Sequence, residues 1–303
     1  MTATTTLRQA LRAPQDLDLT VIDPGGRPVG PQDKKAAAAE VAALGERLGA
    51  LQEALYAEAA GGGHRAVLLV LQGMDTSGKG GVIEHAAGLV NPQGLHIASF
   101  KKPTPEELTH DFLWRIRKQV PAAGMIGVFD RSHYEDVLVV RVNGQACPVD
   151  QRRSGARRRS TGEVTVPEQE WRSRYGAIRA FEAELAAAGV AIVKCMLHIS
   201  PQEQQARLLA RLDDPAKRWK YNPGDVDVRV RWGDYRAAYA DALRETDTDA
   251  APWYVVPSDR KWYRNWAVSA LLAETLEELA PQYPPPSYDV ATERRRVEAS
   301  TVD

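Results

Sequence analysis

Residues 67–81, with the sequence VLLVLQGMDTSGKGG, place phosphate-binding residue types directly after an apolar, strand-like run. Gly73, Gly78 and Lys79 fit the pattern G-x-x-x-x-G-K, in which backbone N–H groups at a helix N-terminus surround phosphate oxygens. Glycine permits the sharp turn, and the lysine reaches a phosphate oxygen. We therefore predict a phosphate-binding loop, for which an ordinary glycine-rich turn is the alternative. Its candidate members are Gly73, Met74, Asp75, Thr76, Ser77, Gly78, Lys79, Gly80 and Gly81.

The predicted loop has an acid inside it and lacks the usual hydroxyl. Gly80 follows Lys79, at the position where most such loops have a Ser or Thr that holds Mg²⁺. Asp75 lies within the loop instead, and a carboxylate beside bound phosphate is repelled unless a divalent cation lies between them. We interpret Asp75 as a Mg²⁺ ligand that replaces the missing hydroxyl. The alternative is an aspartate that turns away and caps its own turn.

A second pair of an acid and a base follows another apolar run. Asp130 and Arg131 come directly after residues 125–129. An acid at the end of a strand beside the phosphate loop holds Mg²⁺ in nucleotide-phosphate enzymes, and an adjacent arginine forks onto phosphate oxygens. Glu135 is a further candidate for metal or acceptor contacts, whereas we interpret His133 as structural. A helix-capping aspartate and a solvated helix start are the alternatives for Asp130 and Glu135.

Two basic groups complete the candidate chemistry. Residues 205–232, which we call the lid segment, read as a helix, a break at Asp213–Pro215 and a second helix. Its inward cations would neutralise phosphate charge while the segment excludes water. A surface helix with paired charges is the alternative for the lid segment, and solvated side chains are the alternative for the lysines that follow the second strand. The candidate cations are Arg207, Arg211, Lys217, Arg218 and Lys220 in the lid segment, with Lys101 and Lys102 after the second strand.

These residues need a scaffold, and the apolar patterns predict one. Strand patterns cover residues 67–71, 96–100, 125–129, 191–199 and 253–256, and helical patterns cover 34–60, 82–90, 105–119 and 263–279. Alternation of strands and helices predicts an α/β fold with a parallel five-stranded sheet flanked by helices. Because ligands of such sheets bind at the carboxyl ends of the strands, the candidate residues are expected to meet there.

The chain divides into three parts by its sequence pattern. Residues 1–32 read as an extended N-terminal arm, residues 33–280 as a single domain and residues 281–303 as an extended C-terminal tail. Within the domain, we interpret the arginine-rich loop 144–167 as a solvated loop, and a polyanion-binding arm is the alternative. Trp219, Trp232 and Tyr235 are expected to pack against the core or the lid segment.

Composition narrows the class of protein. The 303 residues are 44% hydrophobic and carry 39 basic and 40 acidic side chains, for a net charge of −1. The net charge is too small to attract nucleic acid or a membrane surface. Two cysteines give neither a disulfide framework nor a zinc site, and no run approaches a membrane span. We therefore expect a cytoplasmic protein without nucleic-acid or membrane partners.

Several separated segments together resemble the polyphosphate kinase 2 family, and they occur in the same order. The resemblance extends from about Lys34 to Leu279. The matching segments are GMDTSGKGG (73–81), SFKKPTPEEL (99–108), HDFLWR (110–115), FDRSHYEDVLVVRV (129–142), RLDDPAKRWKYNPGD (211–225) and APWYVVPSDRKWYRN (251–265). The arginine-rich loop departs from the family pattern and looks like an insertion.

The resemblance implies a P-loop kinase-like core with a helical lid. It implies that Asp75 and Asp130 organise Mg²⁺, that Lys79 and Arg131 handle phosphate, and that the lid cations bind polyphosphate. The segments SHYED (132–136) and DPAKRWKYNP (214–223) together look most like the class that acts on nucleoside mono- and diphosphates, in which Glu135 helps to accommodate the shorter acceptor. Homodimers and homotetramers are common in the family.

We therefore predict Mg²⁺-dependent phosphoryl transfer from inorganic polyphosphate to ADP, and also to AMP, so that AMP, ADP and ATP are its nucleotide partners. No covalent enzyme intermediate is required. One alternative is an ATP-dependent nucleoside monophosphate kinase, which shares the loop and the Asp-Arg pair. The other is a non-catalytic protein that binds polyphosphate or nucleotide through the arginine-rich loop.

Overall fold

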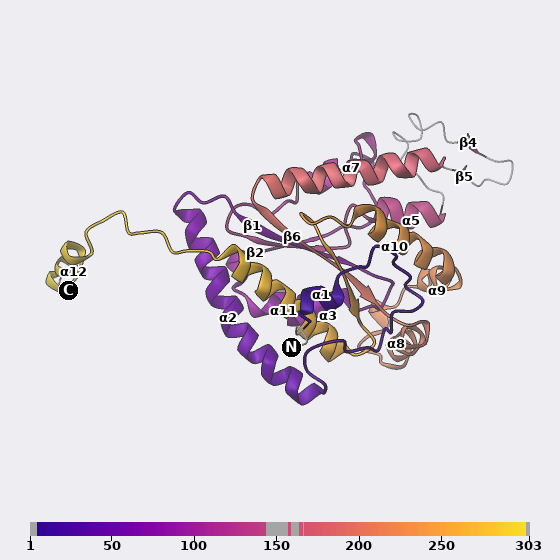
Figure 1. Ribbon diagram of the computed structural model, residues 1–303, viewed down its shortest axis with the longest axis horizontal. Helices are drawn as coiled ribbons and strands as arrows, with labels where there is room; N and C mark the ends of the chain where they lie inside the picture. Colours follow the sequence, from indigo (N-terminus) through magenta and orange to yellow (C-terminus); the bar gives the residue numbers. More distant parts are fainter. Residues whose placement is uncertain (1–4, 144–156, 159–163, 166, 301–303) are drawn as a thin grey trace.

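A five-stranded parallel sheet forms the centre of the molecule, as predicted (Figure 1). The computed structural model describes residues 5–143, 157–158, 164–165 and 167–300. The strand order is β2-β3-β1-β6-β7, and each neighbouring pair runs parallel. The strands are β1 (Ala66–Gln72), β2 (Leu95–Ser99), β3 (Ile126–Asp130), β6 (Val190–His198) and β7 (Trp253–Pro257).

Helices cover both faces of this sheet. The α-helices are α1 (Leu7–Leu11), α2 (Lys34–Ala60), α3 (Lys79–His85), α4 (Trp114–Arg117), α5 (Glu135–Asn143), α7 (Glu168–Ala187), α8 (Pro201–Asp213), α9 (Gly224–Val230), α10 (Trp232–Thr246), α11 (Lys261–Leu279) and α12 (Val290–Ala299). Short 3₁₀ turns occur at Ala87–Leu89, Pro92–Gly94, Glu107–Thr109 and Arg218–Lys220. In Figure 1, α2 and α11 lie on one side of the sheet, while α5, α7 and α10 lie on the other.

The central strand β1 explains why both faces must be covered. All seven of its residues are buried. Val67, Leu69 and Leu71 pack into the core under α2 and α11, and Leu68 and Val70 pack into the core under α5, α7 and α10. A strand that is apolar on both faces requires two helical layers, since either bare face would expose apolar surface to water.

The lid segment lies at the carboxyl edge of the sheet and consists of residues 205–213 of α8, a break, the turn Arg218–Lys220 and α9. Helix α8 begins at the cap Ser200, whose hydroxyl accepts a hydrogen bond from Glu203 N at 3.1 Å. It ends at Asp213 because Asp214 precedes Pro215 and takes an extended conformation, with φ −93° and ψ 108°. The lid segment therefore contributes two helices, α8 and α9, and its residues line a cavity together with those of the phosphate loop.

The predicted helix over residues 105–119 is wrong. The structure has the 3₁₀ turn Glu107–Thr109 and the four-residue helix α4 in its place. Thr104 and Glu107 exchange side-chain hydrogen bonds with each other's backbone N–H groups, and Asp111 Oδ1 accepts from Leu113 N at 3.0 Å. These local bonds compete with the helical ladder, and His110 between them is extended, with φ −109° and ψ 171°.

The expectation of a plainly extended N-terminal arm also needs correction. The arm contains α1, and its residues Leu7, Leu11, Leu17 and Leu19 are buried in the two halves of the core. Arg12 pairs with Tyr254 of the edge strand β7 in an isolated antiparallel bridge. The arm therefore covers the β7 edge of the sheet and belongs to the fold.

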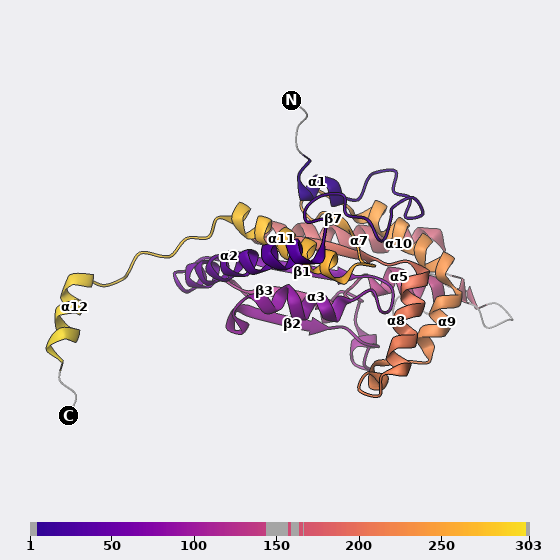
Figure 2. The same ribbon diagram turned by 90° about the horizontal axis from the view of Figure 1, so that it is seen from below.

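The C-terminal tail is extended only in its first part. At its start the tail still contacts the body, since Pro281 is buried and Gln282 N donates to Glu58 Oε2 at 3.1 Å. It then leaves the body and forms α12, which is exposed and lies far from the sheet in both ribbon views (Figures 1 and 2). Most of the arginine-rich loop 144–167 lies outside the described residues. What is described there is the pairing of β4 (Arg157–Arg158) with β5 (Val164–Thr165), together with Pro167. Among the described residues, no helix has both the length and the apolar character needed to cross a membrane.

The buried arm gives a stability prediction. Leu11 is 2% exposed, and its replacement by Ala should lower the free energy of unfolding by about 2–5 kcal/mol through lost burial and a cavity. Val21, in the same arm, is 79% exposed, so Val21→Ala should change that energy by less than about 0.5 kcal/mol. Urea unfolding of both variants measures the difference. Equal effects would show that the arm does not pack as described.

Candidate active site

The phosphate loop connects β1 to α3, and two of its turns require glycine. Gly73 has φ 152° and Gly78 has φ 107°, both in a region that side chains disfavour. A Cβ at Gly73 would lie 2.7 Å from Ser77 Oγ, and one at Gly78 would lie 1.7 Å from a guanidinium nitrogen of Arg264. Thr76 is also left-handed, with φ 64°, which is strained for a β-branched residue. The loop is therefore held in one conformation by its neighbours.

Those neighbours are side chains that bind the carbonyl oxygens of the loop. Arg207 of α8 donates to Thr76 O at 2.9 Å and to Ser77 O at 3.2 Å. Arg264 of α11 donates to Ser77 O at 3.0 Å, and Gln204 donates to Asp75 O at 3.1 Å. Because these side chains bind its carbonyl oxygens, the loop keeps a fixed backbone at the start of α3.

Lys79 lies inside the cradle formed by the loop. Its Nζ donates to Gly73 O at 2.7 Å, so that the side chain folds back over the loop. Burial lowers the pKa of Lys79, and the nearby Asp75 carboxylate offsets part of this effect. A lysine held at this point lies where it would meet an anion bound by the loop.

The Asp130-Arg131 turn lies beside the loop because β3 pairs with β1. The register places Asp130 opposite Leu71, so both strands end at the same level. Arg131 is left-handed, with φ 66°, and its N–H still donates to Leu71 O at 3.2 Å. The turn therefore begins at the end of β3 and aims its side chains at the phosphate loop.

Arg131 joins the acids of the site. Its guanidinium lies 3.1 Å from Asp75 Oδ1 and 3.4 Å from Glu135 Oε2. Burial alone would lower the pKa of Arg131, but Glu135 and Asp75 raise it above its usual value. Burial in turn raises the pKa of the Glu135 carboxyl, and Arg131 opposes that shift. The arginine is therefore a permanent cation between the loop acid and the acid of α5.

Two cavities meet at these residues. The larger, of about 770 Å³, lies between the phosphate loop, the lid segment and the start of α11. The smaller, of about 280 Å³, lies between the loop, α5, α9 and α10. The residues that line both are Asp75, Arg131, Asn222 and Asp225. The two cavities thus share a wall made of the loop acid, the turn arginine and two residues of the lid segment.

The larger cavity is strongly cationic. Among the described residues that line it, the basic side chains are Lys79, Arg131, Arg207, Arg211, Lys217, Lys220, Lys261 and Arg264, and the acids are Asp75, Glu84, Asp130 and Asp225. Eight positive charges against four negative ones favour a polyanion. Burial, with the neighbouring Arg207 charge, lowers the pKa of Arg264 to about 10.

Lys261 and Arg264 were missed in the sequence analysis. Both lie in the first turn of α11, which follows β7 at the carboxyl edge of the sheet. The same rule that selected Lys101 and Lys102 after β2 would have selected them, since each pair follows a parallel strand. Asp225 and Asn222 of the lid segment were also missed, because the pattern of that segment drew attention to its cations alone.

The smaller cavity has a mixed lining. Apolar and aromatic side chains come from Leu138, Val139, Val228, Tyr235 and Tyr239, and polar groups come from Glu135 and Asn143. Tyr239 is buried, which raises its pKa well above the usual value. Tyr235 and Asn143 are joined by a hydrogen bond of 3.4 Å. A partly apolar cavity with a few polar groups is typical of a small-molecule site.

Four candidates line neither cavity, and their positions explain why. Ser77 is fully buried beneath the loop, and its hydroxyl has no hydrogen-bond partner in the described part of the chain. Lys101 and Lys102 are exposed beyond β2. Arg218 does not share a face with Arg207 and Arg211, because α8 ends before it, and its Nε donates to Leu212 O at 2.8 Å. The expected inward position of Arg218 is therefore wrong.

Trp219 also differs from its expected position. Packing was predicted, but the side chain is 78% exposed while it lines the larger cavity. Lys220 Nζ lies 5.1 Å from the centre of its ring. The tryptophan therefore forms the outer rim of the cavity. Tyr235, in contrast, is buried as predicted, and Trp232 packs against the core.

The residues present fit a magnesium ion. The described residues contain no cluster of three or more His, Cys, Asp or Glu side chains suited to a metal. Mg²⁺ does not need one, since it keeps waters and takes its ligands from one or two carboxylates and from substrate phosphates. Within the described ranges, the Asp130 carboxylate accepts no hydrogen bond, and its charge acts on Lys79 and Arg131. Asp75 and Asp130 are therefore a suitable pair of oxygen donors.

Fold and site together define a class of protein. A parallel sheet of this order, a glycine-rich phosphate loop after its central strand, and an acid at the end of the adjacent strand form a P-loop kinase-like core. The family model of Polyphosphate kinase 2 matches residues 31–161 and 163–284. The chain belongs to the polyphosphate kinase 2 family, which confirms the resemblance.

Known relatives agree with this assignment. The chain is 48% identical over 265 residues to the AMP/ADP-polyphosphate phosphotransferase of Meiothermus ruber, covering 88% of this chain and 90% of that one. It is 44% identical over 239 residues to the ADP-polyphosphate phosphotransferase of Rhodopseudomonas palustris, covering 79% and 78%. The crystal structure of Polyphosphate Kinase 2 from Arthrobacter aurescens TC1 matches with a TM-score of 0.89 at 46% identity, covering 97% of each chain.

The loop geometry gives a prediction for Gly78→Ala. A methyl group at φ 107° would collide with the Arg264 guanidinium, so the loop or the arginine must move. Displacement of the phosphate cradle should reduce kcat/KM by about 100-fold. Gly88→Ala is the matched control, because the nearest atom to its Cβ would lie 3.8 Å away. Steady-state turnover of both variants measures the effect, and normal turnover by Gly78→Ala would contradict the described loop.

Proposed function

We propose that this protein transfers a phosphoryl group from inorganic polyphosphate to ADP, and also to AMP, in a Mg²⁺-dependent reaction. The observation that carries the proposal is the meeting of two cavities at Asp75 and Arg131. One cavity suits a long polyanion and the other suits a nucleotide. Phosphoryl transfer requires the end of the donor chain to contact the phosphate of the acceptor nucleotide. The names of the relatives, which are phosphotransferases for AMP, ADP and polyphosphate, support the same reaction.

The larger cavity suits polyphosphate through its charge and position. Polyphosphate carries about one negative charge per phosphate, so a chain needs a series of cations spread along its path. The phosphate loop supplies Lys79, the lid segment supplies Arg211 and Lys220, and α11 supplies Lys261. Lys217 and Lys220 are exposed at the rim, where a long chain would leave the cavity. We assign the terminal phosphates of the donor to the loop.

The smaller cavity suits the acceptor. Its aromatic and aliphatic side chains offer apolar surface to a nucleoside, and Asn143, Asn222 and Glu135 offer hydrogen bonds. Glu135 contacts Arg131, so an acceptor phosphate near that arginine lies beside Glu135. We propose that this pair accommodates the shorter AMP as well as ADP.

The reaction then needs no covalent enzyme intermediate. An oxygen of the acceptor phosphate attacks the terminal phosphorus of the chain, the bond from that phosphorus to the bridging oxygen breaks, and the shortened chain leaves with the electron pair. Lys79 and Arg131 hold the migrating phosphoryl group, and the lid segment excludes water that would hydrolyse the donor. Asp75 and Asp130 would hold Mg²⁺, which would supply charge neutralisation for the two polyanions.

Cellular location and assembly also belong to this proposal. We propose the cytoplasm, because nucleotides and reduced cysteines are typical of it. We propose a homodimer or a homotetramer by analogy with the family. Size-exclusion chromatography with light scattering measures the assembly, and a monomer at all concentrations would contradict this part.

Nucleotide turnover tests the function. Purified protein with Mg²⁺ and long-chain polyphosphate should convert ADP to ATP, and in a separate reaction convert AMP to ADP and then ATP. Conversion of ADP alone would restrict the acceptor to diphosphates. If polyphosphate supports neither reaction and ATP phosphorylates a monophosphate, the protein is an ordinary nucleoside monophosphate kinase.

The metal assignment gives a further prediction. Asp130→Asn should reduce kcat by about 10²–10³-fold, because it removes one of two proposed carboxylate ligands where charge must be neutralised. The free energy of unfolding should change by less than about 1 kcal/mol, since the Asp130 carboxylate accepts no hydrogen bond in the described structure. Asp227→Asn is the control, because this acid of α9 is exposed and lines neither cavity. A near-normal rate for Asp130→Asn would contradict the assignment.

A further inference from the structure

A buried ion pair lies behind the Asp130-Arg131 turn, on the side away from the cavities. Lys194 of β6 and Glu182 of α7 are 0% and 2% exposed, and Lys194 Nζ lies 2.6 Å from Glu182 Oε2. Lys194 also donates to Thr246 O at 2.8 Å. Neither residue lines the two cavities, so neither has a direct role in binding substrate.

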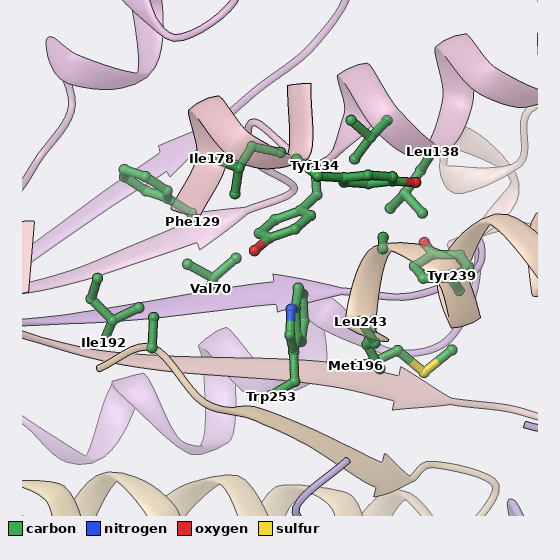
Figure 3. Close-up of a cluster of buried hydrophobic side chains, with 14 of the residues drawn as sticks. Val70, Phe129, Tyr134, Leu138, Ile178, Ile192, Met196, Tyr239, Leu243 and Trp253 are labelled. Atoms are coloured by element: carbon green, nitrogen blue, oxygen red, sulfur yellow. The ribbon is translucent and has the colours of Figure 1, made fainter. Parts of the chain in front are cut away.

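The ion pair reaches the turn through two aromatic residues. The Tyr134 hydroxyl donates to Glu182 Oε1 at 2.8 Å and accepts from Lys194 Nζ at 2.9 Å. His133 Nε2 lies 3.2 Å from the same Glu182 oxygen. Figure 3 shows Tyr134 in the core beside Trp253, and the centres of the two rings are 4.7 Å apart. The third and fourth residues after Asp130 are thus attached to the ion pair.

The turn needs such an attachment because its backbone is strained. Arg131 has φ 66°, and a non-glycine residue there costs about 1 kcal/mol or more relative to an extended or helical conformation. On one side β3 fixes the chain. On the other side Ser132 Oγ lies 3.1 Å from the Gln72 side chain and accepts from Tyr134 N at 3.3 Å. Tyr134 and His133 are the next fixed points.

Stability alone does not explain a charged pair at this place. Removal of two charges from water costs several kcal/mol per ion, and an apolar pair of the same volume is often equally stable or more stable. Burial lowers the pKa of Lys194. Burial alone would raise the pKa of Glu182, but the contacts with Lys194 and His133 hold it below its usual value. What an ion pair provides and an apolar pair does not is directional bonds that fix the position of a hydroxyl and an imidazole.

We propose that Glu182 and Lys194 are positioning residues for phosphoryl transfer, which act through Tyr134 and His133 to hold Arg131 in its strained conformation between Asp75 and Glu135. This inference rests on the proposed function. On this inference the ion pair lowers the energy of the transition state, because Arg131 must be positioned against the migrating phosphoryl group to within a fraction of an ångström. Ground-state binding depends mainly on the other cations of the larger cavity.

The first test is Tyr134→Phe, which removes one hydroxyl and keeps the ring. We expect kcat to fall about 10- to 100-fold while KM for polyphosphate and for nucleotide changes less than about threefold. Tyr175→Phe is the matched control, because Tyr175 is equally buried on α7 and its hydroxyl accepts from Arg141 at 2.8 Å, away from the turn. Equal kcat values for the two variants would overturn the inference.

A double-mutant cycle tests whether Tyr134 acts through Arg131. In an Arg131→Ala background, Tyr134→Phe should cause no further loss of kcat, because the side chain that it positions is absent. Additive losses would show that Tyr134 acts by another route. A merely structural role predicts additivity, since a general loss of stability does not depend on Arg131.

A third test does not depend on turnover. The double variant Glu182→Gln, Lys194→Met removes both charges together, so thermal unfolding should show little loss of stability. Crystal structures of this variant and of Tyr175→Phe should differ at Arg131, with a changed φ or a lost contact to Asp75 in the double variant alone. An unchanged Arg131 would overturn the inference. Absence of polyphosphate turnover in the unmodified protein would contradict the proposed function. The crystal structures would in that case still show whether the ion pair positions Arg131.

Discussion

The accumulation of positive charge at one edge of the sheet is the constraint on which the site depends. Cations this close repel one another when no polyanion is bound, and burial adds a desolvation cost. The structure holds them with backbone carbonyl groups: Lys79 donates to Gly73 O, Arg211 to Lys220 O, and Arg207 to the carbonyls of Ser258 and Asp259 as well as to the loop. These bonds fix the cations before a phosphate arrives, so that little reorganisation is needed on binding.

The order of strands in the parallel sheet places the two cavities next to each other. Because β1 and β3 are adjacent and end together, the phosphate loop and the Asp130-Arg131 turn face each other. Because β6 and β7 lie on the other side of β1, α8 and α11 begin at the same edge and bring Arg207 and Arg264 to the loop. The strain at Thr76 and Arg131 is tolerated because both residues are bonded to elements that the core already fixes.

The sequence predicted the elements that carry a strong local signal. The five strands were found because long apolar runs between turns are typical of buried parallel strands, and the loop, Asp75, Asp130 and Arg131 followed from their spacing. The helix over 105–119 failed because the local bonds of Thr104, Glu107 and Asp111 outweighed the apolar period. The smaller cavity and the link from Lys194 to Tyr134 could not be predicted, since each joins segments that are far apart in the chain.

The central claim is that donor and acceptor phosphates meet at the wall between the two cavities. A crystal structure with AMP, Mg²⁺ and a polyphosphate analogue whose bridging oxygens are replaced by methylene groups tests it directly. We expect the analogue in the larger cavity, AMP in the smaller one, and an acceptor oxygen within about 3–3.5 Å of the terminal phosphorus, beside Asp75 and Arg131. Both ligands in one cavity, or reactive ends separated by protein, would contradict it.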